Sequence, residues 1–193
     1  MVVLNRIYTR AGDGGETRLA TGEQVRKDDA RVAAYGDVDE CNSALGLARL
    51  HAGPDLDPLL EAIQNDLFDL GADLATPDRP GRDLGWEPLR IVEAQVERLE
   101  REIDRLNADL EPLTSFVLPA GAPVAAHLHL ARAVCRRAER RAVTLAAEPG
   151  EQVSPAALKY LNRLSDLLFV AARWSNDHGR ADVLWTPGAG RAG

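Results

Sequence analysis

The sequence has few of the residues that build disulfide or metal frameworks. It contains two cysteines, Cys41 and Cys135, and no Cys or His cluster has the spacing of zinc ligands. We interpret both cysteines as buried thiols. No two histidines form an i,i+4 pair, so we assign no metal ligand among His51, His127, His129 and His178.

Long hydrophobic runs and an excess of positive charge are also missing. No stretch approaches the roughly 20 uninterrupted apolar residues of a membrane span, and Met1–Tyr8 lacks the charged and apolar regions of a signal peptide. The 23 Lys and Arg residues are outnumbered by 30 Asp and Glu residues, for a net charge of -7. Because nucleic acids and anionic membranes attract basic surfaces, we expect neither as a partner. We expect a cytoplasmic protein whose anion site is local.

What the sequence does contain is regular helical patterning. In four segments, apolar residues recur at alternating steps of three and four, as in helices that bury one stripe. The first two stripes are Leu56, Leu60, Ile63, Leu67, Leu70, Leu74 and Leu89, Val92, Val96, Leu99, Ile103, Leu106, Leu110. The other two are Val124, Leu128, Ala131, Cys135, Ala138, Ala142, Leu145 and Leu158, Leu161, Ser165, Leu168, Ala172.

A fifth helix is predicted from about Ala30 to Ala52, with Val32, Val38, Cys41, Leu45 and Ala48 facing inward. Ser154 is the expected N-cap of the last helix, Pro155 its first residue and Gly179 its C-cap. Because the links between helices are short, sequential helices should pack antiparallel. The predicted fold is therefore an all-α five-helix bundle, and we expect neither end of the chain to contribute to its core.

A glycine-rich, non-helical stretch, Thr9–Gly22, precedes the bundle. Its backbone N–H groups, its hydroxyls and the guanidinium groups of Arg10 and Arg18 can wrap a polyphosphate. It is not a Walker loop, because no Gly-Lys-Ser/Thr closes it. Lys27 could reach the same phosphates. An ordinary surface turn and a solvated lysine are the alternatives.

Cationic charge is concentrated on one predicted helix, where Arg132, Arg136 and Arg140 lie one turn apart. Three neighbouring cations repel one another unless an anion joins them, which favours a triphosphate or carboxylates from another helix. Asp39 is a candidate for that carboxylate. The alternative is a solvated face on which Glu139 pairs with an arginine.

Two further side chains are candidate contacts. Asn162 lies at the edge of the last apolar stripe and suits a ribose hydroxyl, although a bond to nearby backbone is the common alternative. Phe116 is one of only three phenylalanines and lies in a predicted link, where it could also cap the core. No arrangement of a protein nucleophile with a base is evident.

Together these motifs resemble the PduO-type family of ATP:cob(I)alamin adenosyltransferases over nearly the whole chain. The matching segments, in order, are Tyr8–Thr17, Arg31–Asn42, Phe116–Gly121, Cys135–Arg140 and Tyr160–Asp166. The resemblance implies a homotrimer with its active site between subunits, ATP held by the N-terminal loop and Mg²⁺ on the ATP phosphates. It also implies that cob(I)alamin attacks the 5'-carbon of ATP, expels triphosphate and yields adenosylcobalamin.

Carried over by position, the resemblance implies specific roles. The implied catalytic residues are Arg136, Asp39, which would pair with Arg136, and Phe116, which would crowd the lower face of the corrin. The implied ATP contacts are Thr9, Arg10, Ala11, Gly12, Thr17, Arg18, Lys27, Arg136, Arg137, Glu139, Arg140 and Asn162. Relatives often have lysine at the position of Gly14, so one phosphate contact is supplied elsewhere or missing. No direct Mg²⁺ ligand is implied.

We therefore expect a single domain over residues 1–193, with an ATP-binding segment (1–29), the bundle (30–178) and a tail (179–193) of open role. A reductase and an adenosylcobalamin-dependent acceptor enzyme are further candidate partners. Two rival functions remain. A helical nucleotide pyrophosphohydrolase would need clustered carboxylates for Mg²⁺, for which Glu97 and Glu100 are the only hint. A non-enzymatic helical binding module would have a disordered N-terminus.

Overall fold

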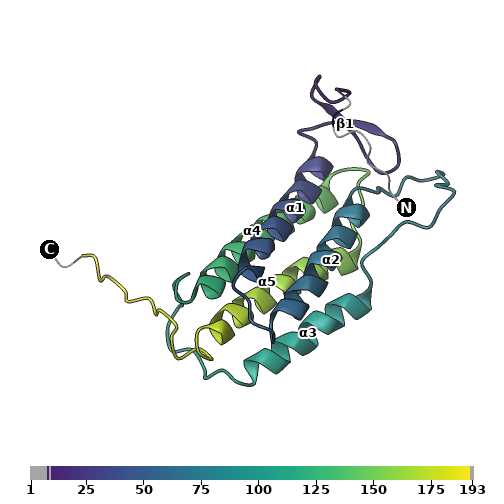
Figure 1. The fold of residues 1–193 in the computed structure, drawn as a ribbon. Helices are drawn as coiled ribbons and strands as arrows, with labels where there is room; N and C mark the ends of the chain where they lie inside the picture. The colour runs from purple at the N-terminus through teal and green to yellow at the C-terminus, as the bar shows by residue number, and fades with distance from the viewer. Residues whose placement is uncertain (1–7, 9, 192–193) are drawn as a thin grey trace.

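The computed structural model describes residue 8 and residues 10–191, and it contains the five predicted helices (Figure 1). A two-stranded hairpin precedes them. The elements are β1 (Glu16–Arg18), β2 (Gln24–Arg26), α1 (Ala30–Arg49), α2 (Asp57–Leu74), α3 (Glu93–Asn107), α4 (Pro123–Ala147) and α5 (Pro155–Ser175). The all-α bundle is confirmed. None of the described helices combines the length and apolar character needed to span a bilayer.

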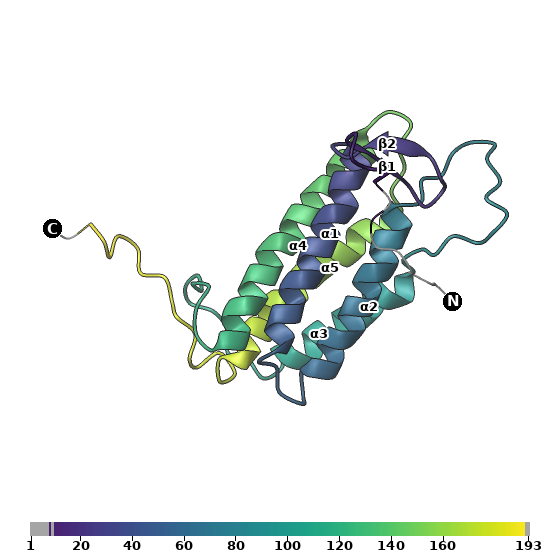
Figure 2. The same cartoon turned by 45° about the horizontal axis from the view of Figure 1, so that its top comes forward.

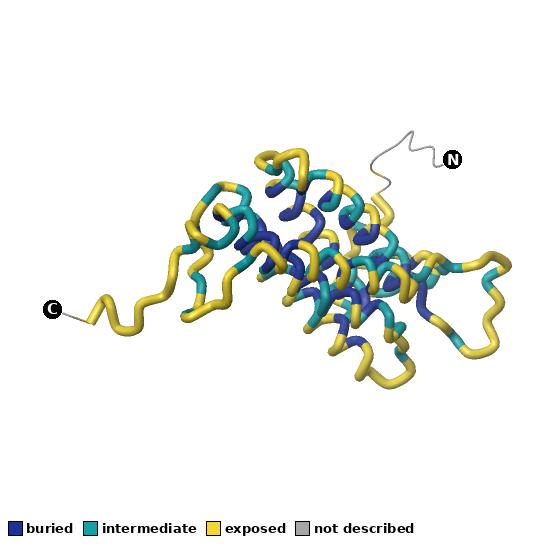
Figure 3. The backbone as a smooth tube through the Cα atoms, turned by 90° about the horizontal axis from the view of Figure 1, so that it is seen from below, coloured by how far each residue is buried: buried dark blue, intermediate teal, exposed yellow. Residues whose placement is uncertain are grey.

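Each helix runs opposite to the one before it in the sequence (Figure 1). The most extensive packing joins α1 to α4, followed by α4 to α5, and α1 also packs against α2. Helix α3 packs mainly against α5, beside the layer formed by the other helices (Figure 2). Buried residues form continuous stripes along the inner faces, while the loops and the tail are exposed (Figure 3).

The predicted stripes form the core except at the start of α3 and at Val32 of α1, which is half-buried outside the core. Leu89 and Val92 are 51% and 54% exposed, because α3 begins only at Glu93. The backbone of Val92 is extended, and its N–H donates to Oε1 of Gln95, which caps the helix. The prediction that Leu89 and Val92 belong to the buried stripe was therefore wrong. Helix α1 also ends at Arg49, three residues before the predicted end.

The start of α5 is as predicted and its end is not. Ser154 Oγ accepts a hydrogen bond from the Ala157 N–H at 3.1 Å, and Pro155 is the first helical residue. The C-cap is Asn176 instead of Gly179. Gly179 has a φ of +81°, and its N–H donates to the Arg173 carbonyl at 2.9 Å, so it continues the turn that follows the cap.

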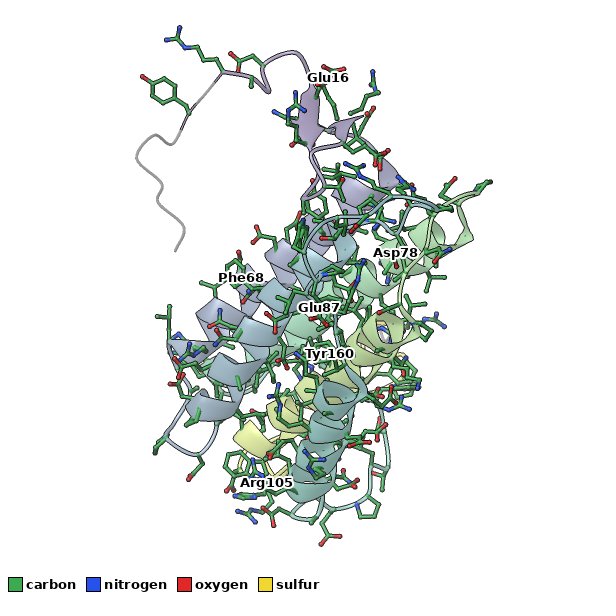
Figure 4. The ribbon with its side chains drawn as sticks, turned by 90° about the vertical axis from the view of Figure 1, so that its right-hand side faces the viewer. Glu16, Phe68, Asp78, Glu87, Arg105 and Tyr160 are labelled. Carbon is green, nitrogen blue, oxygen red and sulfur yellow. The ribbon has the colours of Figure 1, made fainter. Side chains whose placement is uncertain are left out.

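A buried carboxylate ties α3 to the bundle. Asp66 of α2 accepts a hydrogen bond from the Tyr160 hydroxyl of α5 at 2.8 Å and pairs with Arg98 of α3. Figure 4 shows Tyr160 within the body of the bundle. Burial, and then the Asp66 carboxylate, raise the pKa of Tyr160, so its hydroxyl remains a donor. This contact fixes the position of the helix with the fewest buried apolar residues.

Both ends of the chain contribute more than we expected. Leu19, in the turn between β1 and β2, is buried, and the Ala20 N–H donates to the Ala75 carbonyl at 3.0 Å. In the tail, Leu184 forms an antiparallel bridge with Val117 of the loop before α4. The expectation that neither end contributes to the core was wrong for Leu19, because a single apolar residue in a turn forms no periodic pattern and is buried only when the turn docks near Ala75.

A buried hub anchors the start of the tail. Asp182 pairs with Arg173 at 2.8 Å and accepts a hydrogen bond from Nδ2 of Asn176 at 3.2 Å. Oδ1 of Asn176 accepts from the Ala122 N–H at 2.9 Å, so the hub also holds the loop that precedes α4. Glycine is required beside it, because Gly121 has a φ of +105° and its missing Cβ would lie 2.2 Å from Oδ1 of Asn176.

Replacing Gly121 with alanine should lower the free energy of unfolding by about 2 to 4 kcal/mol, because it adds a clash to a left-handed backbone. Urea denaturation measures the change. Gly53→Ala is the control, since nothing lies within 4 Å of its missing Cβ, and it should change stability by less than about 1 kcal/mol. Equal losses in the two variants would contradict this account.

Candidate functional site

The N-terminal hairpin gathers most of the predicted phosphate contacts around one hollow. Antiparallel pairing of Thr17 with Val25 and of Arg18 with Gln24 places the two strands side by side. The hollow has a volume of about 460 Å³ and is lined by Ala11, Gly12, Glu16, Thr17, Arg18, Gln24 and Lys27. Thr9 lies outside the described residues. Arg10 is exposed, with its guanidinium 5.8 Å from the centre of the Tyr8 ring.

Lys27 faces the glycines of this segment. Its backbone N–H donates to the Gly15 carbonyl at 2.8 Å, and its Nζ lies 3.1 Å from the position that a Cβ on Gly12 would occupy. A side chain at position 12 would therefore displace the ammonium group. Gly14 lies in open space, with no heavy atom within 4 Å of its missing Cβ, so the local structure leaves room there for a longer side chain.

The arginines of α4 divide into two sets. Arg137 pairs with Glu40 and, at 3.4 Å, with Asp37, and Arg141 lies 3.7 Å from Asp37, so both are neutralised by α1. Arg136 and Arg140 form no ion pair within the described residues of the chain, and their one mutual contact is a 2.9 Å hydrogen bond from Nη1 of Arg140 to the Arg136 carbonyl.

Asp39 does not meet Arg136 within one chain. It is exposed on α1 and has no ion pair among the residues that the structure describes. Its neighbours Asp37 and Glu40 make the contacts to α4 instead. Arg137, expected at the ATP site, is the arginine that these acids hold. Arg136 and Asp39 therefore remain available to groups from outside the chain.

Arg132 is the most buried of the three regularly spaced arginines, and its position favours an anion. Its Nε is buried without a hydrogen-bond partner in the described structure, and its guanidinium lies 5.9 Å from the centre of the Phe169 ring. Burial, and then the charge of Arg136, lower its pKa. An anion beside Arg132 and Arg136 would offset both the burial of the Arg132 charge and the repulsion between the two arginines.

Helix α5 adds the predicted asparagine. Nδ2 of Asn162 donates to Oε1 of Glu139 on α4 at 2.9 Å, and its Oδ1 accepts from Nη1 of Arg163 at 2.7 Å. Glu139 and Asn162, predicted from separate motifs, are thus in direct contact. Both side chains could turn to ribose hydroxyls at the cost of these partly exposed bonds.

Phe116 is 76% exposed at the edge of an apolar hollow of about 460 Å³. The hollow is lined by Leu113, Thr114, Ser115, Phe116, Val117, Arg132 and Phe169. The Trp185 ring packs edge-on against Phe116, with 5.9 Å between ring centres. The backbone N–H of Trp185 also donates to the Phe116 carbonyl at 2.8 Å. Sequence reasoning missed Phe169 and Trp185, because neither lies in a recognisable motif; the scarcity of aromatic residues was the only available signal.

The two hollows lie at opposite ends of the bundle. The hairpin precedes the first residue of α1, and Phe116 precedes the first residue of α4, which starts at the other end (Figure 1). A helix of 25 residues, the length of α4, is about 37 Å long. Figure 4 shows the same separation, with Glu16 on the hairpin and Arg105 at the far end. One chain therefore does not bring the hairpin to Phe116.

Known proteins are similar to this chain in sequence and in fold. A family model described as cobalamin adenosyltransferase matches residues 7–175. The corrinoid adenosyltransferase of Mycobacterium tuberculosis is 50% identical over 98% of this chain and 97% of the relative, and that of Bacillus subtilis is 42% identical over 89% and 86%. A solved variant of a PduO-type ATP:corrinoid adenosyltransferase from Lactobacillus reuteri, complexed with cobalamin and ATP, has a TM-score of 0.86 and 39% identity, covering 94% of this chain and 97% of that one.

Proposed function

The chain belongs to the cobalamin adenosyltransferase family, and on that premise we propose how its residues carry out the reaction. It is an ATP:corrinoid adenosyltransferase, which transfers the 5'-deoxyadenosyl group of ATP to the cobalt of a reduced corrinoid. The observation that carries the assignment of the site is that Arg136 and Arg140 have no acid partner among the described residues of their own chain, while Arg18 and Lys27 line a hollow at the hairpin.

In this reaction the corrinoid supplies the nucleophile. The electron pair of cob(I)alamin forms the bond from cobalt to the 5'-carbon, the bond from that carbon to oxygen breaks, and triphosphate leaves with its electrons. The chain therefore needs no catalytic base. Arg136 and Arg140 would stabilise the negative charge that grows on the leaving group, and Thr17, Arg18 and Lys27 would hold the triphosphate in line.

We place the active site between copies of this chain in a homotrimer. The distance between the hairpin and Phe116 supports this, because ATP held at the hairpin of a chain cannot meet a corrinoid at the other end of that same chain. Asp39 borders an apolar groove between α1 and α2, and Phe68, on the rim of this groove, is 71% exposed (Figure 4). A second copy would cover this face and bring its Arg136 to Asp39.

Mg²⁺ would enter with ATP and neutralise phosphate charge. Among the described residues no three His, Cys, Asp or Glu side chains gather as a metal site. The Glu16 carboxylate, which accepts a hydrogen bond from Gln24, is the one acidic side chain lining the hairpin hollow. The residues at the hairpin therefore fit an ion held mainly by the phosphates, with the Glu16 carboxylate in the same hollow.

Phe116 would bind the corrinoid on its lower face. An apolar ring there displaces the lower axial ligand of cob(II)alamin, and the resulting four-coordinate cobalt is easier to reduce. Its exposure and the neighbouring Phe169 support this role. A reductase would then supply the electron, and an adenosylcobalamin-dependent enzyme would accept the product. The buried free thiols of Cys41 and Cys135 suit the cytoplasm, where thiols stay reduced.

The decisive experiment is to mix the protein with MgATP and chemically reduced cobalamin under anaerobic conditions. Conversion of the corrinoid spectrum to that of adenosylcobalamin, with one triphosphate released per product, is expected. Release of pyrophosphate without a change in the corrinoid would indicate a nucleotide pyrophosphohydrolase. Sedimentation should give the mass of a trimer, and a monomer with full activity would refute the interface site.

ATP should protect the hairpin from trypsin, which cleaves after Arg18 and Lys27. With ATP at about 100 times its Kd, local opening of the hairpin falls about 100-fold, and cleavage there should slow accordingly. Cleavage after the exposed Arg180, at the other end of the bundle, is the control and should be unchanged. Equal slowing at both positions would mean that ATP acts on the whole fold instead of on the hairpin.

A further inference from the structure

A chain of ion pairs links the turn of the hairpin to the interior of the bundle. We call Glu23, Arg79, Glu151 and Arg31 the hairpin anchor. Arg79 contacts Glu23 at 3.1 Å and Glu151 at 2.9 Å, so it lies between the two carboxylates. Glu151 also pairs with Arg31. Three parts of the chain that are distant in sequence, residues 23–31, 79 and 151, thereby meet at the end of the bundle that carries the hairpin.

The inner end of the anchor is rigid. The Arg31 side chain is 2% exposed, and Nη1 donates to the Leu74 carbonyl at 2.5 Å, where α2 ends. Nη2 also donates to the Gln152 carbonyl at 3.2 Å. Burial alone would raise the pKa of Glu151, but hydrogen bonds from Arg31 and Arg79 outweigh burial and lower it, so the carboxylate is charged at neutral pH.

The outer end of the anchor adjoins the hairpin hollow, because Glu23 is followed by Gln24, which lines it. Glu23 directly precedes β2, and its carbonyl accepts from the Leu19 N–H at 2.9 Å, which closes the turn. The strand before this turn, β1, carries Thr17 and Arg18, and Lys27 follows the strand after it, β2. The turn has few other ties to the bundle, namely buried Leu19, the Ala20 to Ala75 hydrogen bond, and contacts from Arg82 to Thr21 and Glu23.

We propose that Arg79 is a positioning residue for ATP, which holds the hairpin docked on the bundle so that Thr17, Arg18 and Lys27 converge on the triphosphate. This inference rests on the proposed function of the hairpin. Without Arg79 the hairpin would spend part of its time undocked, and the apparent Kd for ATP would equal the intrinsic Kd divided by the fraction of time that the hairpin is docked. The apolar hollow at Phe116, at the far end of the same chain, would not be affected.

The competing explanation is that Arg79 merely stabilises the fold. The chain offers a matched pair to separate the two. Arg49 is 25% exposed, as is Arg79, and its guanidinium contacts Asp57 at 2.7 and 3.0 Å. This pair joins α1 to α2 at the opposite end of the bundle from the hairpin. Arg49→Ala therefore removes a comparable pair without touching the hairpin.

The test compares wild type with Arg79→Ala, Arg79→Lys, Glu23→Gln and Arg49→Ala. Calorimetry measures the Kd for MgATP without corrinoid, and steady-state assays give kcat and both KM values. A docked fraction of one tenth in Arg79→Ala would raise the Kd and KM for ATP about tenfold, with KM for the corrinoid unchanged. Arg79→Lys keeps one charge contact and should fall between wild type and Arg79→Ala.

A double-mutant cycle tests whether the effect runs through the hairpin. Glu23→Gln breaks the same link and also weakens the 3.8 Å contact between Glu23 and Arg82, so it should raise the Kd less in Arg79→Ala than in wild type. Additive effects would overturn the proposal. So would a Kd for Arg79→Ala within twofold of wild type, or an equal rise in Arg49→Ala. Thermal denaturation of all variants checks that the fold is retained.

Failure of this inference is distinguishable from failure of the proposed function. If wild type binds MgATP but transfers no adenosyl group, the proposed function fails, while the Kd comparison still decides the role of Arg79. If wild type transfers adenosyl and Arg79→Ala matches it in every constant, the positioning role fails and the proposed function stands.

Discussion

Replacing Arg136 with alanine is expected to lower kcat/KM for adenosyl transfer by about 10² to 10³-fold, the loss typical of removing one preorganised group that stabilises transition-state charge. Arg136 is exposed on α4 and has no ion pair within the described part of its own chain. Its removal therefore leaves no buried acid without a partner, and the fold should be retained. Stopped-flow spectroscopy of corrinoid conversion measures the rate.

Arg105→Ala is a suitable control for Arg136→Ala, because Arg105 is also a solvent-exposed helical arginine and its one ion pair is with Glu102 on the same helix. It should keep wild-type activity. If Arg136 contacts the leaving group, triphosphate should bind more weakly to Arg136→Ala. Inhibition by added triphosphate should therefore weaken in the same variant that loses rate. A fully active Arg136→Ala would rule out its assignment to the site.

Replacing Phe116 with alanine should have the second-largest effect, and the size should depend on the oxidation state of the substrate. From cob(II)alamin with a reductant, we expect the rate of adenosyl transfer to fall about 100-fold. This corresponds to a shift of about 120 mV in a one-electron reduction potential. From chemically prepared cob(I)alamin the loss should be much smaller, because the reduction step is bypassed. Electronic spectra with ATP bound should lose the four-coordinate cob(II)alamin signature.

Leu118→Ala provides the control for Phe116→Ala. Leu118 is a partly exposed apolar residue in the same loop, and its N–H donates to the Val183 carbonyl at 2.8 Å whatever its side chain. It should retain the four-coordinate signature. Equal losses from cob(I)alamin and cob(II)alamin in Phe116→Ala would show that the ring aligns the corrinoid without acting on its lower ligand.

Several site assignments could be made from sequence because their signals are local. The spacing of Arg132, Arg136 and Arg140 follows from the helical repeat, and the glycines before Thr17 are read directly. Which acids meet which arginines could not be predicted. Asp37, Asp39 and Glu40 are near neighbours in sequence, but the orientation of α1 against α4 turns Asp37 and Glu40 toward Arg137 and leaves Asp39 exposed.

The sequence alone determined the five helices, most of their buried stripes, the Ser154 cap and the motifs of the family, because each depends on residues within a few turns of one another. The burial of Leu19, the packing of Trp185 on Phe116 and the link from Glu23 through Arg79 to Glu151 became visible in the folded molecule. The physical reason is that these contacts join segments far apart in the chain, and no periodic pattern encodes which charged or aromatic side chains will meet once the helices have packed.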